Sequence, residues 1–225
     1  MRESGVLFVP ENEAQSYAAV SKCKVVAVPN TIRGITPTRN WVLDHAEREG
    51  ETLVVFIDDD VKDAGWLEFK EDHVKRRKLN DGELLSEFRK LFDMTEGMGY
   101  RVWGAKTENS PRSTYPFKPF LFRTYITASC MGMFSNGEKR MRFDERFTVK
   151  EDYEICLRCI KEDGGLIGAR YFHWHNEHWT TEGGCKDYRT REVEMKCIGL
   201  LRKLYPGMVD HTPSPSGEYT IRLNV

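Results

Sequence analysis

Three consecutive aspartates are the residues of this chain whose type and spacing most directly suggest chemistry. Asp58, Asp59 and Asp60 follow the apolar run at 52–57 (TLVVFI). Three carboxylates at the end of a buried strand repel one another unless a cation neutralises them. Their hard oxygen atoms suit Mg²⁺ or Mn²⁺, which often bridge a few carboxylates to the phosphates of a substrate. The pattern predicts a divalent metal site; the alternative is a solvated acidic turn.

A polar cluster at 34–40 (GITPTRN) opens a helical pattern that ends near Gly50. Helix N-termini attract anions, and an arginine can bind a diphosphate with both branches of its guanidinium group. Arg39 is therefore a candidate for binding phosphate. The alternative is an arginine in an ordinary surface ion pair.

Two neighbouring carboxylates begin a second helical pattern at 151–160, shortly after the segment 143–147 (FDERF). Acidic side chains in a first helical turn often only complement the helix dipole. Beside a metal site, however, Glu151 or Asp152 could act as a general base that takes a proton from an attacking hydroxyl group.

Three histidines lie among aromatic residues at 171–179 (YFHWHNEHW). A neutral imidazole from His173, His175 or His178 could complete the coordination of a metal held by the aspartates. A structural zinc site is the competing interpretation, but the cysteines nearest in sequence lie in a helical core pattern or apart from the histidines.

Strands and helices must alternate to position these groups. Apolar patterns predict strands or extended segments at 6–9, 24–28, 52–57, 101–105, 120–134 and 166–174, and helices at 11–21, 36–50, 81–92 and 151–160. This order predicts an α/β fold with a mainly parallel sheet, helices on both faces, and ligands at the carboxyl ends of the strands. A turn at 213–217 should precede a final short strand.

Composition limits the classes of protein to consider. The 225 residues fit one α/β domain, and 34 Lys and Arg residues balance 35 Asp and Glu residues, so net charge does not steer the chain toward nucleic acid. The six cysteines are spread through the sequence, and no long apolar run or signal peptide is apparent. We therefore expect a cytoplasmic protein without disulfides and without a membrane partner.

The sequence lacks the G-x-G-x-x-G fingerprint, the Walker phosphate loop and the G-x-S-x-G elbow. The commonest dinucleotide-binding, NTPase and hydrolase classes are thereby disfavoured. What remains is the joint occurrence of a G-I-T-P-T-R-N helix start, D-D-D, F-D-E-R-F, E-D-Y-E and a late histidine. In this order the motifs resemble glycosyltransferases of the GT-A fold, in particular family 2-like members, over about 6–178.

The resemblance implies a nucleotide-diphospho-sugar transferase fold, a Rossmann-like mixed sheet flanked by helices on both faces. A single domain would span 1–225, with a donor nucleotide-binding half at 1–107 and an acceptor-binding half at 108–225. Asp58 would contact the nucleotide of a UDP-sugar donor, and Arg39 would support the donor near its diphosphate. Pro10, Arg33 and Asp59 would complete the donor site.

On the same resemblance, Mn²⁺ or Mg²⁺ would be bound by Asp60 and by His175, with His173 as the second choice because the strand register is not visible in the sequence. Asp152 would be the catalytic base of an inverting enzyme, with Glu151 beside it. That geometry implies attack from the face of the sugar opposite the leaving diphosphate.

A narrower resemblance is to the TET/JBP-associated glycosyltransferases of bacteriophages, relatives of the base J glucosyltransferase. It rests on R-G-I-T-P-T-R-N-W-V-L-D-H-A and F-I-D-D-D-V. It implies transfer of a hexose, with glucose expected, onto a hydroxymethylated pyrimidine of DNA in the cytoplasm of a host cell. Cationic runs at 70–78, 139–142 and 186–191 could contact phosphates, and Trp66, Trp174 and Trp179 could stack on a base or belong to the core.

Three alternatives remain. A GT-A enzyme acting on a saccharide, lipid-linked or protein acceptor would share every donor motif. A sugar nucleotidyltransferase also places aspartates beside a metal, although it usually has a glycine-rich loop that 6–17 lacks. A binding module that has lost turnover is the non-enzymatic alternative.

Overall fold

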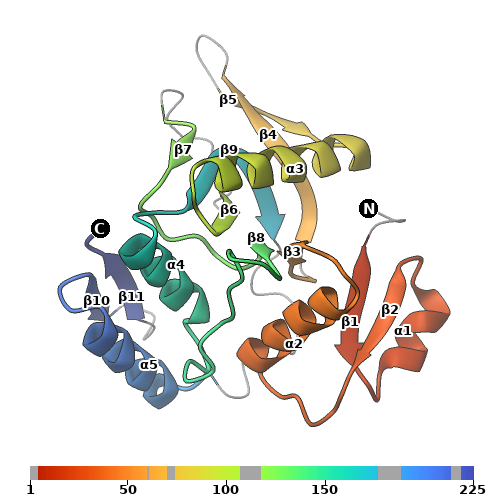
Figure 1. The fold of residues 1–225 in the computed structure, drawn as a ribbon, viewed down its shortest axis with the longest axis horizontal. Helices are drawn as coiled ribbons and strands as arrows, with labels where there is room; N and C mark the ends of the chain where they lie inside the picture. The colour runs from red at the N-terminus through yellow and green to blue at the C-terminus, as the bar shows by residue number, and fades with distance from the viewer. Residues whose placement is uncertain (1–4, 60, 70–73, 107–117, 177–188, 214–218) are drawn as a thin grey trace.

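A mixed seven-stranded sheet forms the centre of the fold (Figure 1), seen in a computed structural model that describes residues 5–59, 61–69, 74–106, 118–176, 189–213 and 219–225. The helices are α1 (Ala14–Val20), α2 (Ile35–Arg48), α3 (Asp81–Gly97), α4 (Glu151–Glu162) and α5 (Arg191–Leu204). The strands are β1 (Val6–Pro10), β2 (Lys24–Val28), β3 (Leu53–Ile57), β4 (Val61–Phe69), β5 (Val74–Lys78), β6 (Val102–Lys106), β7 (Phe120–Leu121), β8 (Cys130–Phe134), β9 (Ile167–Asn176), β10 (Val209–Pro213) and β11 (Tyr219–Leu223).

The strand order of the large sheet is β3-β8-β6-β9-β4-β5, with β7 also pairing with β9. Among the described residues of this sheet, β6 and β9 pair in parallel and the other pairs are antiparallel. The prediction of a mixed sheet is confirmed, whereas the expectation of a mainly parallel one is wrong. The reason is that β8 inserts antiparallel between β3 and β6, while β4 and β5 form a hairpin that the sequence pattern did not suggest.

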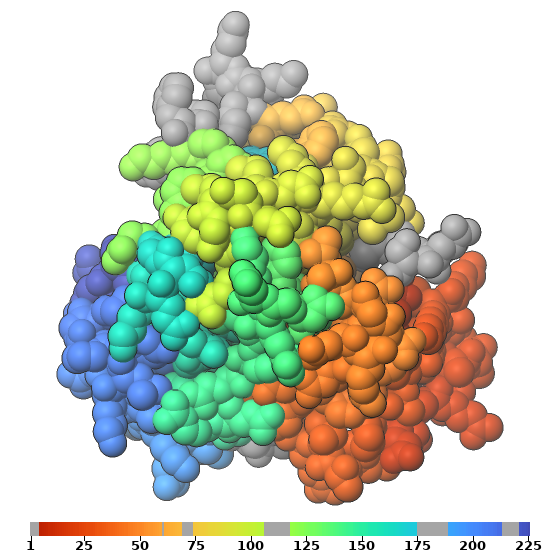
Figure 2. Space-filling model, viewed as in Figure 1, coloured from red at the N-terminus to blue at the C-terminus, as the bar shows by residue number. Residues whose placement is uncertain are grey.

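The first two strands do not join this sheet. β1 and β2 pair in parallel with each other and, together with α1, form a small unit at the N-terminal side of the molecule. In the space-filling view of Figure 2, the red and orange N-terminal residues and the blue C-terminal residues occupy opposite sides, with the middle of the chain between them.

Helices cover both faces of the large sheet, as predicted. In β8 the side chains alternate: Cys130 and Phe134 pack with the apolar face of α3, whereas Met131 and Met133 pack with Leu43 of α2 and with α4. The apolar residues of α3 recur at helical spacing and include Leu84, Phe88, Leu91 and Phe92. None of the described helices is both long and apolar enough to cross a bilayer.

Gly132 of β8 lies opposite Trp103 of β6, and the fully buried indole ring of Trp103 occupies the space where a side chain at 132 would be. A Cβ atom there would lie well inside contact distance of the ring. Overpacking of this kind costs about 1–3 kcal/mol. We expect Gly132→Ala to lower the free energy of unfolding by that amount in urea titrations.

Gly199→Ala is the matched control. Gly199 lies exposed within α5, and an added Cβ would meet no atom within 4 Å. Because alanine favours helix more than glycine does, this variant should gain about 0.5–1 kcal/mol. Equal stability losses in both variants would contradict the packing assigned to Trp103.

The C-terminal elements form a third apolar cluster. Cys197, Ile198 and Leu201 of α5 pack with Phe147 and Leu157, and the cluster also includes residues of the β10–β11 hairpin. The final short strand expected from the sequence is β11, whereas α5 was not expected. The described cysteines are free thiols, and Cys185 lies outside the described residues.

Candidate active site

The acidic turn lies directly after β3, at the carboxyl end that the sequence indicated. The backbone N–H of Asp58 donates to the carbonyl oxygen of Ser129 at 3.2 Å, its side chain is 39% exposed, and Asp59 is exposed. Asp60, expected to bind the metal, lies outside the described residues. The strand directions place the carboxyl ends of β3, β6 and β9 at the same edge of the sheet.

β9 approaches this turn with its last residues. Its first part pairs with β6, whereas its second part pairs with β4, where Asn176 lies opposite Val61, one residue beyond the aspartates. The backbone of His175 lies opposite Asp63, and the side chain of His175 is outside the described part. The end of β9 and the acidic turn are therefore neighbours.

His173, the second choice for the metal, is 1% exposed. Phe172 and Trp174, on either side of it, pack in the cluster that contains α3, so His173 faces the opposite side of the sheet. His178 lies outside the described residues. Within the described part of the chain, no three side chains of the metal-ligating kinds form a cluster.

Arg39 connects two of the predicted acidic sites. Its Nη1 donates to Glu151 Oε1 at 2.6 Å and its Nη2 to Asp58 Oδ1 at 3.2 Å, while the residue itself is only 6% exposed. The guanidinium group also lies against the rings of Phe56 and Phe143. A charged group this buried requires such partners. Arg39 thereby fixes the end of β3 relative to the start of α4.

Two motifs more than 100 residues apart in the sequence dock on each other at this point. The buried hydroxyl of Thr36 donates to the carbonyl oxygen of Phe147 at 2.5 Å. The Asn40 amide donates to the Phe143 carbonyl oxygen at 2.9 Å and accepts from the Phe143 N–H at 2.7 Å. The T-P-T-R-N helix start and the F-D-E-R-F segment thus hold α2 against the approach to α4.

Asp152 lies in the first turn of α4 and lines a cavity of about 260 Å³. This carboxylate cavity is also lined by Tyr125, Lys150, Glu151, Tyr153 and Arg189. The Tyr125 hydroxyl donates to Asp152 Oδ2 at 2.5 Å, and the Tyr153 N–H donates to Asp152 Oδ1 at 2.9 Å. Burial, reinforced by the nearby Asp152, raises the pKa of Tyr125 well above its usual value, so the hydroxyl remains a donor.

The residue before this pair has an unusual backbone. Lys150, the N-cap of α4, has φ 67°, in the left-handed region that a lysine rarely adopts. Its buried ammonium group lies 3.3 Å from Glu194 of α5, and Arg189 lies 2.7 Å from the same carboxylate. A strained residue held by its surroundings is typical of functional sites. Here it sets the direction in which α4 presents Glu151 and Asp152.

Glu151 differs from Asp152 in its surroundings. Burial, and then the proximity of Asp152, raises the pKa of Glu151 from 4.5 to about 7, although Arg39 opposes the shift. The folded protein therefore binds this proton more tightly than the unfolded chain does. The associated stability is fully present below pH 4.5 and is lost as the pH rises through about 7.

We expect Glu151→Gln to remove this dependence. Relative to the variant, the wild-type free energy of unfolding should fall by about 3 kcal/mol between about pH 4.5 and 7, the change that a pKa difference of this size produces. Urea titrations across that pH range measure it. The control Glu138→Gln, at an exposed position, should keep the wild-type dependence of the unfolding free energy on pH. If this dependence were the same in the wild type and in Glu151→Gln, the raised pKa of Glu151 would be refuted.

The other predicted donor residues flank the N-terminal unit. Pro10 ends β1 and is exposed. Arg33, also exposed, lies between β2 and α2, where its Nε donates to the carbonyl oxygen of Asn30 at 3.3 Å. Pro10 thus lies at the carboxyl end of β1, and Arg33 follows the carboxyl end of its parallel neighbour β2.

The cationic runs are largely neutralised where they are described. Arg140 and Arg142 pair with Asp44 and Glu47. Arg76 and Lys78 pair with Asp63, Arg77 pairs with Glu68 and Glu83, and Arg189 pairs with Glu194. These runs mainly form intramolecular ion pairs.

The tryptophans suggested for base stacking have separate environments. Trp174 is fully buried, so it belongs to the core and does not offer its ring for stacking on a base. The guanidinium carbon of Arg77 lies 4.4 Å from the centroid of the half-buried Trp66 ring. Trp179 lies outside the described residues.

Tyr125 was not identified from the sequence. It lies in a stretch whose composition indicated only extended structure, and no spacing connects it to a carboxylate 27 residues later. An isolated tyrosine carries no local signal of such a contact.

A family model described as TET-Associated Glycosyltransferase matches residues 2–184, which is most of the chain. It includes the acidic turn, the α2 start, the 143–147 segment and the carboxylate cavity's Glu151 and Asp152. α5, β10 and β11 lie beyond the match. No curated protein and no solved structure matches the chain.

Proposed function

Because the chain belongs to the TET-associated glycosyltransferase family and is therefore a glycosyltransferase, we propose that it transfers a hexose from a UDP-sugar to the hydroxymethyl group of a modified pyrimidine in DNA. Glucose is the hexose that we expect. The observation that carries the proposal is the family match over the segment that contains both Asp58 and Asp152.

Asp152 is proposed as the general base. It lies half-buried in the carboxylate cavity, with Tyr125 and the Tyr153 N–H fixing its orientation. As the acceptor oxygen bonds to the anomeric carbon, its proton passes to Asp152, and the bond from that carbon to the diphosphate breaks. Attack opposite the leaving group inverts the anomeric centre. Glu151 holds Arg39 and, through it, Asp58.

The donor is proposed to bind where β3 ends. Asp58 would contact the nucleotide, and Arg39 would support the donor near its diphosphate by holding Asp58 in position. Pro10, Arg33 and Asp59 would complete this site.

A divalent metal, Mn²⁺ or Mg²⁺, is proposed to be held by Asp60 and His175. The approach of the end of β9 to the acidic turn supports this ligand set, as does the preference of these ions for carboxylate oxygens. When bound, the metal would offset the charge that develops on the leaving diphosphate.

Removal of divalent metal should abolish transfer. We expect no hexose transfer in excess EDTA and full recovery when Mn²⁺ or Mg²⁺ is added beyond the chelator. The readout is radiolabel moved from the UDP-sugar to the acceptor. Undiminished turnover in EDTA would show that the leaving group departs without a metal.

The acceptor is tested with three substrates: DNA that contains hydroxymethylcytosine, the same DNA with cytosine, and a set of oligosaccharides. The proposal predicts that mass spectrometry detects one added hexose per modified base in the first DNA only. A hexose added only to the oligosaccharides would keep the chain a glycosyltransferase and refute the DNA acceptor.

A further inference from the structure

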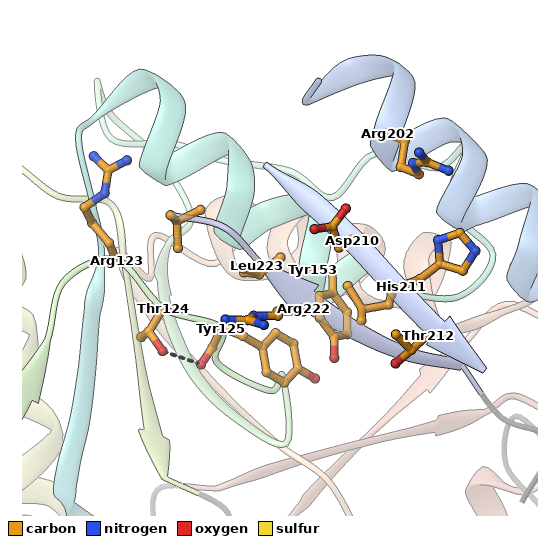
Figure 3. Close-up of a pocket in the computed structure, with 12 residues that line it drawn as sticks. Arg123, Thr124, Tyr125, Tyr153, Arg202, Asp210, His211, Thr212, Arg222 and Leu223 are labelled. Atoms are coloured by element: carbon orange, nitrogen blue, oxygen red, sulfur yellow. Dashed lines mark hydrogen bonds between the residues drawn. The ribbon is translucent and has the colours of Figure 1, made fainter. Parts of the chain in front are cut away.

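A second pocket adjoins the carboxylate cavity. It has a volume of about 800 Å³, within the range of ligand-binding pockets. The residues of this C-terminal pocket that matter here come from the segment before β8, from α4 and α5, and from the β10–β11 hairpin: Arg123, Tyr125, Tyr153, Arg202, His211 and Arg222. Figure 3 shows Arg123 at one end, the two tyrosines and Arg222 in the middle, and Arg202 and His211 at the other end.

The pocket concentrates positive charge. Arg123, Arg202 and Arg222 are exposed, and none of the three forms an ion pair with a described residue. The acidic lining residue Asp210 accepts a hydrogen bond from the Asn224 amide at 2.7 Å. Since the whole chain has a net charge of −1, three arginines around one pocket are a local feature. They contrast with the ion-paired arginines of the cationic runs.

Two stacked tyrosines connect this pocket to the proposed base. Tyr125 and Tyr153 line both the C-terminal pocket and the carboxylate cavity. Their ring centroids are 4.0 Å apart and their planes differ by 15°. The hydroxyl of Tyr125 contacts Asp152. The two tyrosine rings therefore form an aromatic surface between the C-terminal pocket and Asp152, the proposed general base. A nucleobase of a bound molecule can stack on this surface.

Glu151 and Asp152 have contacts in two different directions, which separates the C-terminal pocket from the proposed donor site. Glu151 bonds to Arg39, which bonds to Asp58 in the proposed donor site, whereas Asp152 bonds to Tyr125, which lines the C-terminal pocket. The donor is proposed to bind at Asp58, so the side of the C-terminal pocket is left for the acceptor.

We propose that the C-terminal pocket binds the acceptor DNA strand: its arginines contact backbone phosphates, and the modified base lies at the tyrosine pair with its hydroxymethyl group at Asp152. This inference rests on the proposed function, because it assumes a DNA acceptor. Guanidinium groups bind phosphates with charge-assisted hydrogen bonds, and aromatic rings accept bases without reading their sequence. Arg202 and Arg222 lie outside the family match, so this part of the acceptor site belongs to the C-terminal elements.

The test is the double variant Arg202→Gln with Arg222→Gln, assayed on a single-stranded oligonucleotide that contains hydroxymethylcytosine. Its KM for the oligonucleotide should rise at least about tenfold, with the larger change in acceptor KM rather than in donor KM. The slope of log affinity against log salt should become shallower by about 1.4, since each lost phosphate contact removes about 0.7.

The matched control is Arg48→Gln with Arg89→Gln, two exposed arginines on α2 and α3 that change the net charge equally. It should retain the wild-type KM and salt slope. If both double variants use the oligonucleotide as the wild type does, the pocket proposal is overturned and the DNA acceptor stands. If the wild type itself transfers hexose only to oligosaccharides, the proposed function fails and the pocket proposal fails with it.

Discussion

Asp152→Asn is expected to lower kcat for hexose transfer by about 10²–10⁴, the contribution typical of a positioned general base. The amide keeps the size of the carboxylate: its carbonyl oxygen can still accept from the Tyr153 N–H, and its NH2 group can donate to the Tyr125 hydroxyl oxygen, so the first turn of α4 should remain in place. It cannot take the proton of the acceptor hydroxyl. Calorimetric titration with UDP should give an affinity within about twofold of the wild type, because the proposed donor contacts lie at Asp58.

Asp93→Asn, on the exposed side of α3, controls for the loss of one carboxylate and should leave kcat unchanged. The assignment of Asp152 depends on the contrast between the two variants. If Asp152→Asn turned over at the wild-type rate, the general base would have to be another group. The neighbouring carboxylate of Glu151 would then be the first candidate.

Arg39→Met should have the largest effect on stability. At pH 8 it leaves the buried carboxylate of Glu151 without its cation, and breaking such a buried pair costs about 3–5 kcal/mol. At pH 5 the loss should be smaller, because a group with a pKa of about 7 is then protonated. Urea titrations at the two pH values measure the difference.

Arg48→Met on the same helix is the matched control. Arg48 is exposed and lies over the Trp41 ring, so its replacement should cost less than about 0.5 kcal/mol at either pH. Equal losses for Arg39→Met at pH 5 and pH 8 would show that packing around Arg39, rather than the charge of Glu151, accounts for its effect.

Periodicity predicted most of the elements, since buried strands and amphipathic helices leave strong local patterns. The run at 52–57 became β3 (Leu53–Ile57), and the helix expected from Glu151 begins at that residue as α4. α5 could also have been predicted: Thr190 accepts from the Val193 N–H as an N-cap, and Arg202 with Lys203 lies in the last turn.

Strand direction could not be read from the same patterns. An apolar run is equally compatible with a parallel or an antiparallel neighbour, and only the tertiary structure places β8 between β3 and β6. The sequence therefore predicted which residues end strands but not which strands are adjacent.

The candidate site was predictable where its residues are clustered in the sequence. Asp58, Arg39 and Glu151 belong to recognisable motifs, and the structure joins them in one ion-pair network. Arg123 and Arg222, by contrast, are 99 residues apart (222 − 123) and surrounded by unrelated residues. The local density of basic residues indicated instead the cationic runs, most of whose described arginines form intramolecular ion pairs.

The ion pair between Lys150 and Glu194 makes the residue in front of Glu151 depend on the last part of the chain. A protein truncated at residue 184, where the family match ends, would lose Glu194 and expose Phe147 and Leu157. Lys150 would then be free to relax from its left-handed backbone, and the first turn of α4, which carries Asp152, would lose its anchor on α5. The described C-terminal elements α5, β10 and β11 thus support the start of α4, which carries the proposed general base, and are not a removable appendage.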